Sequence, residues 1–209
     1  RGQIVKGKNK AGRRGSPTLP VTIPYTTISY LSENAMQADA RAFGKMMQHV
    51  REYDEAEGTV ITVQVENETG LLGNAREVSD EADAAFAGEV PQEFASYMRS
   101  HTEYMEEDVR AAVEAGAEKG SWSEVFGAAA EEIFSAYHVA SFVEYVAKAG
   151  KDAYDLPMTA NCWLDKAADT PGDYPSGGPV ARVHEVWDYC APSIDVYCPD
   201  IYVPYFNKV

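Results

Sequence analysis

The sequence lacks the features that mark several large classes of protein. No run approaches the ~18 consecutive apolar residues of a membrane-spanning helix, so no membrane association is expected. The first residues have no apolar region typical of a secretory signal, and the chain does not begin with Met, so we expect the natural start to lie upstream. Only three of 209 residues are cysteine, at spacings that fit neither a zinc site nor a disulfide framework. Nothing in the sequence identifies the compartment or the oligomeric state.

Basic residues are also scarce, since 18 Lys and Arg stand against 33 Asp and Glu, for a net charge of −15. Six of the positive charges fall within the first fifteen residues, so the remainder of the chain is still more acidic. An acidic body repels phosphate backbones, which argues against nucleic acid as a partner, whereas a neutral sugar meets no such penalty. The four histidines lack metal-ligand spacing, and the sequence indicates no metal or other cofactor.

Segments typical of strands and helices alternate along most of the chain. Short apolar, β-branched runs predict three buried parallel strands, at 59–65, 156–163 and 194–202. Apolar residues at helical spacing predict five helices, at 34–53, 79–86, 91–117, 131–149 and 180–189. This alternation indicates an α/β protein with a parallel sheet, preceded by a long loop or arm over residues 1–31, of which 21–31 are extended in character.

The strongest candidate for a functional site is residues 64–70, which read Gln-Val-Glu-Asn-Glu-Thr-Gly. They place two carboxylates and a carboxamide at the carboxyl end of a predicted parallel strand, where α/β proteins form active sites. Strand alternation puts Gln64, Glu66 and Glu68 on one side, with Asn67 facing away unless a bulge turns it. A glycosidase needs a carboxylic acid to protonate the departing oxygen, and a neighbouring amide suits a sugar hydroxyl. The alternative is a polar strand end with no catalytic role.

The motif Val-Gln-Val-Glu-Asn-Glu-x-Gly resembles that of family 35 glycoside hydrolases, the β-galactosidases of a large clan that shares a (β/α)8 barrel. Four further stretches resemble the bacterial branch of this family: 38–43, 121–127, 172–179, and 191–195 with 199–202. The resemblance covers roughly residues 35–205, and many members have Tyr where this chain has Thr69. A complete barrel needs ~250 residues, so the resemblance implies a partial TIM barrel, with residues 32–209 forming about strands four to six.

Through this resemblance, Glu68 is expected to be the general acid/base, and Asn67 to bind a hydroxyl of the sugar. Glu66 is expected to support them as a polar residue at the barrel mouth. Four more candidates for substrate binding end the next two strands: Asn161, Trp163, Asp200 and Tyr202. In this clan a Tyr at the position of Tyr202 often contacts the nucleophile, and Trp163 is either a sugar-stacking platform or part of the core.

The second catalytic carboxylate is not found in this chain. In the family it is a Glu that ends the seventh strand, but here no Glu follows Glu185, which lies within a predicted helix. The resemblance therefore implies a retaining glycoside hydrolase acting on a β-galactoside, with its nucleophile beyond this chain, and an isolated chain that is inactive. Two alternatives remain open: another exo-glycosidase of the same clan, and a non-catalytic carbohydrate-binding fragment.

Overall fold

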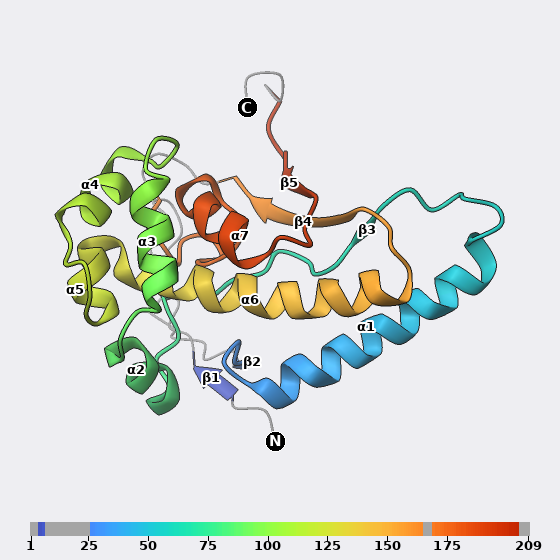
Figure 1. Ribbon diagram of the computed structural model, residues 1–209, viewed down its shortest axis with the longest axis horizontal. Helices are drawn as coiled ribbons and strands as arrows, with labels where there is room; N and C mark the ends of the chain where they lie inside the picture. The colour runs from blue at the N-terminus through green and yellow to red at the C-terminus, as the bar shows by residue number, and fades with distance from the viewer. Residues whose placement is uncertain (1–3, 7–25, 165–168, 205–209) are drawn as a thin grey trace, which may run out of the picture.

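A computed structural model describes residues 4–6, 26–164 and 169–204 and has a mixed α/β architecture with far more helix than strand (Figure 1). In chain order the elements are β1 (Ile4–Lys6), β2 (Thr26–Ile28), α1 (Glu33–Asp54), β3 (Val63–Gln64), α2 (Asp80–Ala87), α3 (Gln92–Ser100), α4 (Glu107–Ala115), α5 (Trp122–Phe126), η1 (Gly127–Ala129), α6 (Ala130–Ala153), β4 (Met158–Trp163), η2 (Ala181–Val183), α7 (His184–Cys190) and β5 (Val196–Asp200). Within these ranges, no helix has both the length and the apolar character needed to cross a membrane.

β3, β4 and β5 form one parallel sheet in that order. Val63 pairs with Met158, and Thr159 pairs with Val196. Parallel neighbours require crossover connections, which are provided here by the helices between consecutive strands. The predicted order and direction of the three strands are therefore confirmed.

The two faces of this sheet have different surroundings. Met158 lies on the helix-covered face, since a Cβ on Gly150 of α6 would lie 3.0 Å from its Cε atom. Tyr197 of β5 lies on the same face and packs edge-on against Trp187 of α7. By strand alternation the opposite face carries Gln64, Thr159, Asn161, Trp163, Val196, Cys198 and Asp200. Val196 is 50% exposed, so solvent reaches this second face.

The prediction of one helix over 91–117 is wrong, because the chain forms α3 and α4 with a break between them. Both helices contribute to the same core, with Met98 buried in α3 and Val109 buried in α4. Arg99 holds the folded-back arrangement by donating a 2.8 Å hydrogen bond to the carbonyl of Gly116, just beyond α4.

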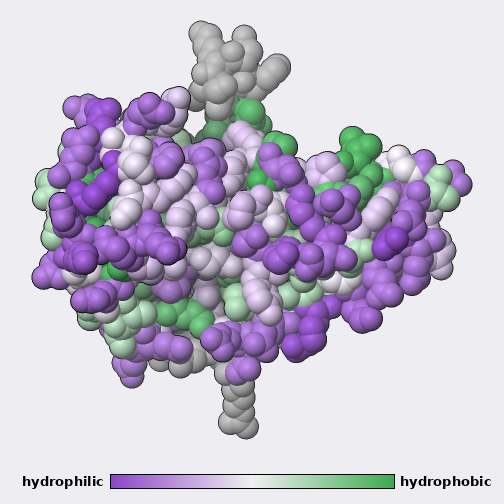
Figure 2. All heavy atoms as spheres, in the orientation of Figure 1, coloured by the Kyte–Doolittle hydropathy of each residue, from purple (hydrophilic) through white to green (hydrophobic). Residues whose placement is uncertain are grey.

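β3 is much shorter than the predicted strand 59–65. Asp54, at the end of α1, accepts hydrogen bonds from the backbone N–H groups of Thr59 (2.8 Å) and Val60 (2.9 Å), which ties these residues to the end of the helix. Ile61 is 78% exposed, and Figure 2 shows hydrophobic side chains gathered over the segment that leads into β3. Only two residues of the predicted strand therefore join the sheet.

Part of the expected N-terminal arm is ordered as strand. β1 pairs antiparallel with β2, and Ile4 lies opposite Ile28. β1 departs from the loop expected at the start of the chain, whereas β2 falls within the segment expected to be extended. Five of the six basic residues near the start of the chain lie outside the described residues.

A glycine-rich loop packs against the segment that follows β3. Leu71 and Ser176 exchange two backbone hydrogen bonds of 2.9 Å, which join the two loops as an isolated antiparallel bridge. A Cβ on Gly178 would lie only 2.3 Å from the carbonyl oxygen of Thr69. The close backbone contact therefore leaves no room for a side chain at position 178 and fixes the position of the motif loop.

Gly178→Ala is expected to lower the free energy of unfolding by about 1–3 kcal/mol, because the added methyl group forces the two loops apart. Gly88→Ala is the matched control, since its Cβ would lie 3.1 Å from the nearest atom, a carbonyl oxygen that needs to move only slightly. Urea denaturation of both variants measures the difference. Equal losses of stability would contradict the proposed role of the loop contact.

Candidate active site

The chain turns sharply after β3 instead of continuing as a strand. The last hydrogen bond of the ladder runs from the N–H of Val65 to the carbonyl of Thr159 (3.0 Å). Glu68 has a φ of 48°, and no other non-glycine residue in the described ranges has a positive φ. A left-handed backbone at a non-glycine residue costs about 1–3 kcal/mol, so surrounding contacts must hold it in place. The expected regular alternation through Glu68 is therefore wrong beyond Val65.

Asn161 of β4 supplies these contacts. Its buried side-chain oxygen accepts a 2.9 Å hydrogen bond from the backbone N–H of Glu68. Its Nδ2 atom donates to Oδ1 of Asn67 (3.3 Å) and to Oδ2 of Asp200 (2.9 Å). One amide thereby links the carboxyl ends of all three strands of the sheet.

Asn67 turns back over the strand from which it emerges. Its Oδ1 atom also accepts a 3.3 Å hydrogen bond from Nε2 of Gln64, and both side chains are exposed. Asn67 therefore lies on the same side as Gln64, as expected if a bulge turns the chain. The Asn67 amide nitrogen can donate a hydrogen bond to a ligand.

A cavity of about 330 Å³ opens beside the turn. Its lining residues come from the ends of all three strands: Glu68, Trp163, Leu164, Asp200, Tyr202 and Val203. Trp163 is partly buried, whereas Tyr202 is 89% exposed and forms part of the rim. Aromatic walls with a few convergent polar groups are typical of small-molecule sites and suit the apolar faces and polar edges of a sugar ring.

Glu66 lies apart from this group and interacts with Asp39 of α1. Partial burial, followed by a hydrogen bond to Asp39 and by the negative charge of that residue, raises the pKa of Glu66 to about 7. Tyr30 lies nearby, and its hydroxyl oxygen accepts a 3.2 Å hydrogen bond from the N–H of Gly70. Within the described ranges, Glu66 has no hydrogen bond to the other predicted site residues and does not line the cavity.

Asp39 and Tyr30 were not predicted to belong to the site. Asp39 falls between Met36 and Phe43, at three- and four-residue spacing, and so lies on the apolar stripe of its helix. A carboxylate on the apolar stripe of α1 indicates that a polar group of another element lies opposite it, and this signal could have identified Asp39.

In the cavity at the carboxyl ends of the strands, the carboxyl group of Glu68 is the group that can transfer a proton. Glu68 contributes the carboxyl group that faces the cavity, and Asp200 is held by its hydrogen bond to Asn161. Within the described ranges, no group of three or more His, Cys, Asp or Glu residues could hold a metal ion. The residues present are therefore suited to acid/base chemistry on a ligand that the aromatic side chains hold.

The raised pKa of Glu66 predicts a dependence of stability on pH. Because folding raises this pKa from 4.5 to about 7, the protonated carboxyl stabilises the folded chain fully below pH 4.5 and loses that effect as the pH rises through about 7. Glu66→Gln stays neutral, so its free energy of unfolding should fall less than that of the wild type over this interval. Urea denaturation across the pH range measures this, with the exposed Glu57→Gln as control. Identical pH profiles for wild type and Glu66→Gln would exclude the effect.

Comparison of the sequence with protein families and curated proteins identifies no relative of this chain. No family model matches the sequence, and no curated protein shows significant similarity to it. The resemblance to family 35 glycoside hydrolases therefore rests on the motifs themselves.

Proposed function

We propose that this chain is part of a retaining glycoside hydrolase that acts on β-galactosides, with Glu68 as the general acid/base. The observation that carries the proposal is the placement of Glu68 at the carboxyl edge of a parallel sheet. There it lines a cavity together with Trp163 and Tyr202, and Asn161 holds its backbone. Active sites of parallel α/β barrels form at this edge.

The two unlike faces of the sheet support the assignment to a partial (β/α)8 barrel. In such a barrel one face of each strand packs on the outer helices, and the other points to the barrel interior. Here α7 packs on the face that carries Tyr197, while Asn161 and Asp200 lie on the opposite face. We propose that β3, β4 and β5 are barrel strands four, five and six, and that α1, α6 and α7 belong to the outer layer.

In the proposed mechanism, Glu68 protonates the departing glycosidic oxygen and later deprotonates the attacking water. Asn67 donates a hydrogen bond to a sugar hydroxyl, and Trp163 stacks on the sugar ring. Asn161 and Asp200 keep the turn in position, and Tyr202 closes the rim of the cavity. A nucleophilic carboxylate from outside residues 1–209 would lie ~5–5.5 Å from the Glu68 carboxyl group.

Glu68→Gln is expected to slow hydrolysis of an alkyl β-galactoside by about 100- to 10,000-fold, because the poor leaving group depends on protonation. The assay requires a polypeptide that also supplies the nucleophile. A dinitrophenyl β-galactoside should be cleaved with a smaller loss in its first step. Azide attacks the covalent intermediate without a base, so it should restore turnover of this substrate by Glu68→Ala. Glu57→Gln is the control, and unchanged turnover of the alkyl galactoside by Glu68→Gln would refute the assignment.

The 209-residue chain alone is expected to lack glycosidase activity, because without a nucleophile the covalent intermediate cannot form. Hydrolysis of an aryl β-galactoside by the purified chain tests this. Turnover that Glu68→Gln abolishes would mean that another residue of this chain is the nucleophile. Saturable sugar binding with no activity, even after the missing strands are supplied, would favour the non-catalytic carbohydrate-binding alternative.

A further inference from the structure

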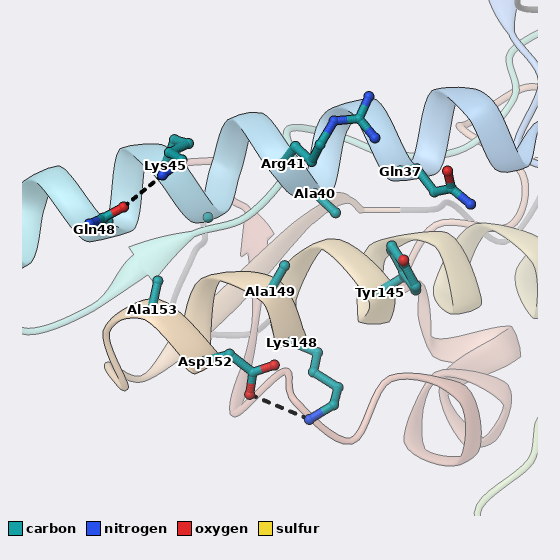
Figure 3. A pocket seen from close by; sticks show the side chains of 11 residues that line it. Gln37, Ala40, Arg41, Lys45, Gln48, Tyr145, Lys148, Ala149, Asp152 and Ala153 are labelled. Carbon is teal, nitrogen blue, oxygen red and sulfur yellow. Dashed lines mark hydrogen bonds and ion pairs between the residues drawn. The ribbon is translucent and has the colours of Figure 1, made fainter.

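A groove of about 780 Å³ runs along the outer seam between α1 and α6 (Figure 3). It shares no lining residue with the cavity around Glu68. An inference drawn from this groove therefore stands independently of the proposed glycosidase activity.

The groove exists because small residues face each other along the seam. The two helices run in the same direction, with Gly44 beside Ala149 and Gln48 near Ala153 (Figures 1 and 3). A Cβ on Gly44 would lie 3.2 Å from the carbonyl oxygen of Ala149, so the helices approach closely at this point. Ala40 completes a floor of small apolar groups, and longer polar side chains stand along both edges.

The groove is long enough to receive another helix. The twelve residues from Gln37 to Gln48 on α1 span about 16 Å of helix, or three turns. A third helix can place small apolar side chains into a groove of this kind by ordinary ridge-into-groove packing. Tyr145, which is 46% exposed on the α6 edge, provides an aromatic contact of the type enriched at protein interfaces.

The rim of the groove is basic on a strongly acidic chain. Three cations line the groove, Arg41 and Lys45 on α1 and Lys148 on α6. The one carboxylate among the lining residues is Asp152, which pairs with Lys148 at 3.5 Å. Neither Arg41 nor Lys45 forms an ion pair with any residue that the structure describes, although Lys45 donates to Oε1 of Gln48. The chain as a whole carries a net charge of −15, so the groove concentrates positive charge that lacks a partner.

Several other basic side chains of the described chain are engaged in close ion pairs. Arg51 pairs with Glu55, Lys151 with Asp195, and Arg182 with Glu132, at distances of 2.7–3.0 Å. Arg110 and Lys119 also lack an ion pair within the described ranges, but neither lines the groove, whereas Arg41 and Lys45 stand one helical turn apart on the same groove edge.

We propose that this groove binds an acidic amphipathic helix of a partner protein. Small apolar side chains of that helix would contact the floor, and its flanking carboxylates would pair with Arg41, Lys45 and Lys148. The net negative charge of the rest of the chain repels an acidic helix, whereas the basic groove attracts it, so the helix is expected to dock in the groove. A symmetric contact with a second copy is disfavoured, because it would bring two basic rims together.

A synthetic 18-residue helical peptide with Ala and Leu on one face and Glu on both flanks tests the proposal. Fluorescence anisotropy should show saturable binding that weakens as salt is added, since exposed ion pairs are screened. Arg41→Glu should weaken binding at least tenfold. Lys119→Glu, at an exposed cation in the loop between α4 and α5, should change it less than twofold.

Three results would overturn the proposal. The first is no binding of the peptide, and the second is equal weakening by Arg41→Glu and Lys119→Glu, which would mean non-specific attraction. The third is a dimer in sedimentation velocity that Arg41→Glu dissociates, which would make a second copy the occupant. A peptide with Lys in place of Glu should fail to bind, and circular dichroism verifies that each variant is folded.

Discussion

The side-chain amide of Asn161 is the interaction on which the candidate site depends. Each end of this amide bonds to a different neighbouring strand terminus, Glu68 on one side and Asp200 on the other. Because the amide is buried, loss of the bond from the Glu68 N–H would leave the side-chain oxygen without a partner among the described residues, at a cost of about 1–3 kcal/mol. The sheet edge and the motif loop therefore behave as one unit, although they come from distant parts of the sequence.

The glycine-rich loop restrains the same motif from its other side. Gly178 lies against the backbone of Thr69, and Leu71 pairs with Ser176, so the residues after Glu68 cannot relax outward. A left-handed residue between two fixed anchors is held by its surroundings rather than by its own preference. Catalytic groups need restraint of this kind, because small displacements of a proton donor reduce its effectiveness.

Much of the architecture could be predicted from the sequence, because buried strands and amphipathic helices leave periodic patterns. The helices expected at 34–53 and 131–149 match α1 and α6 closely. The break in 91–117 could not be predicted, since residues 101–106 contain neither Gly nor Pro, and the contact of Arg99 with Gly116 forms only in the folded chain. The direction of the strands alone predicted that Asn161 and Asp200 meet at the carboxyl edge of the sheet. The orientation of Glu66 could not be predicted in this way, because the turn after Val65 depends on the side-chain amide of Asn161, which is far along the chain.

The hydrogen bonds from Thr59 and Val60 to Asp54 have a consequence for the solubility of the chain. They tie the residues before β3 to the end of α1, and the outer strand of the sheet is only Val63–Gln64. An outer strand this short presents few free N–H and C=O groups on which another polypeptide could add a strand. The contact of Asp54 with Thr59 and Val60 therefore also limits the addition of strands from other molecules at this edge.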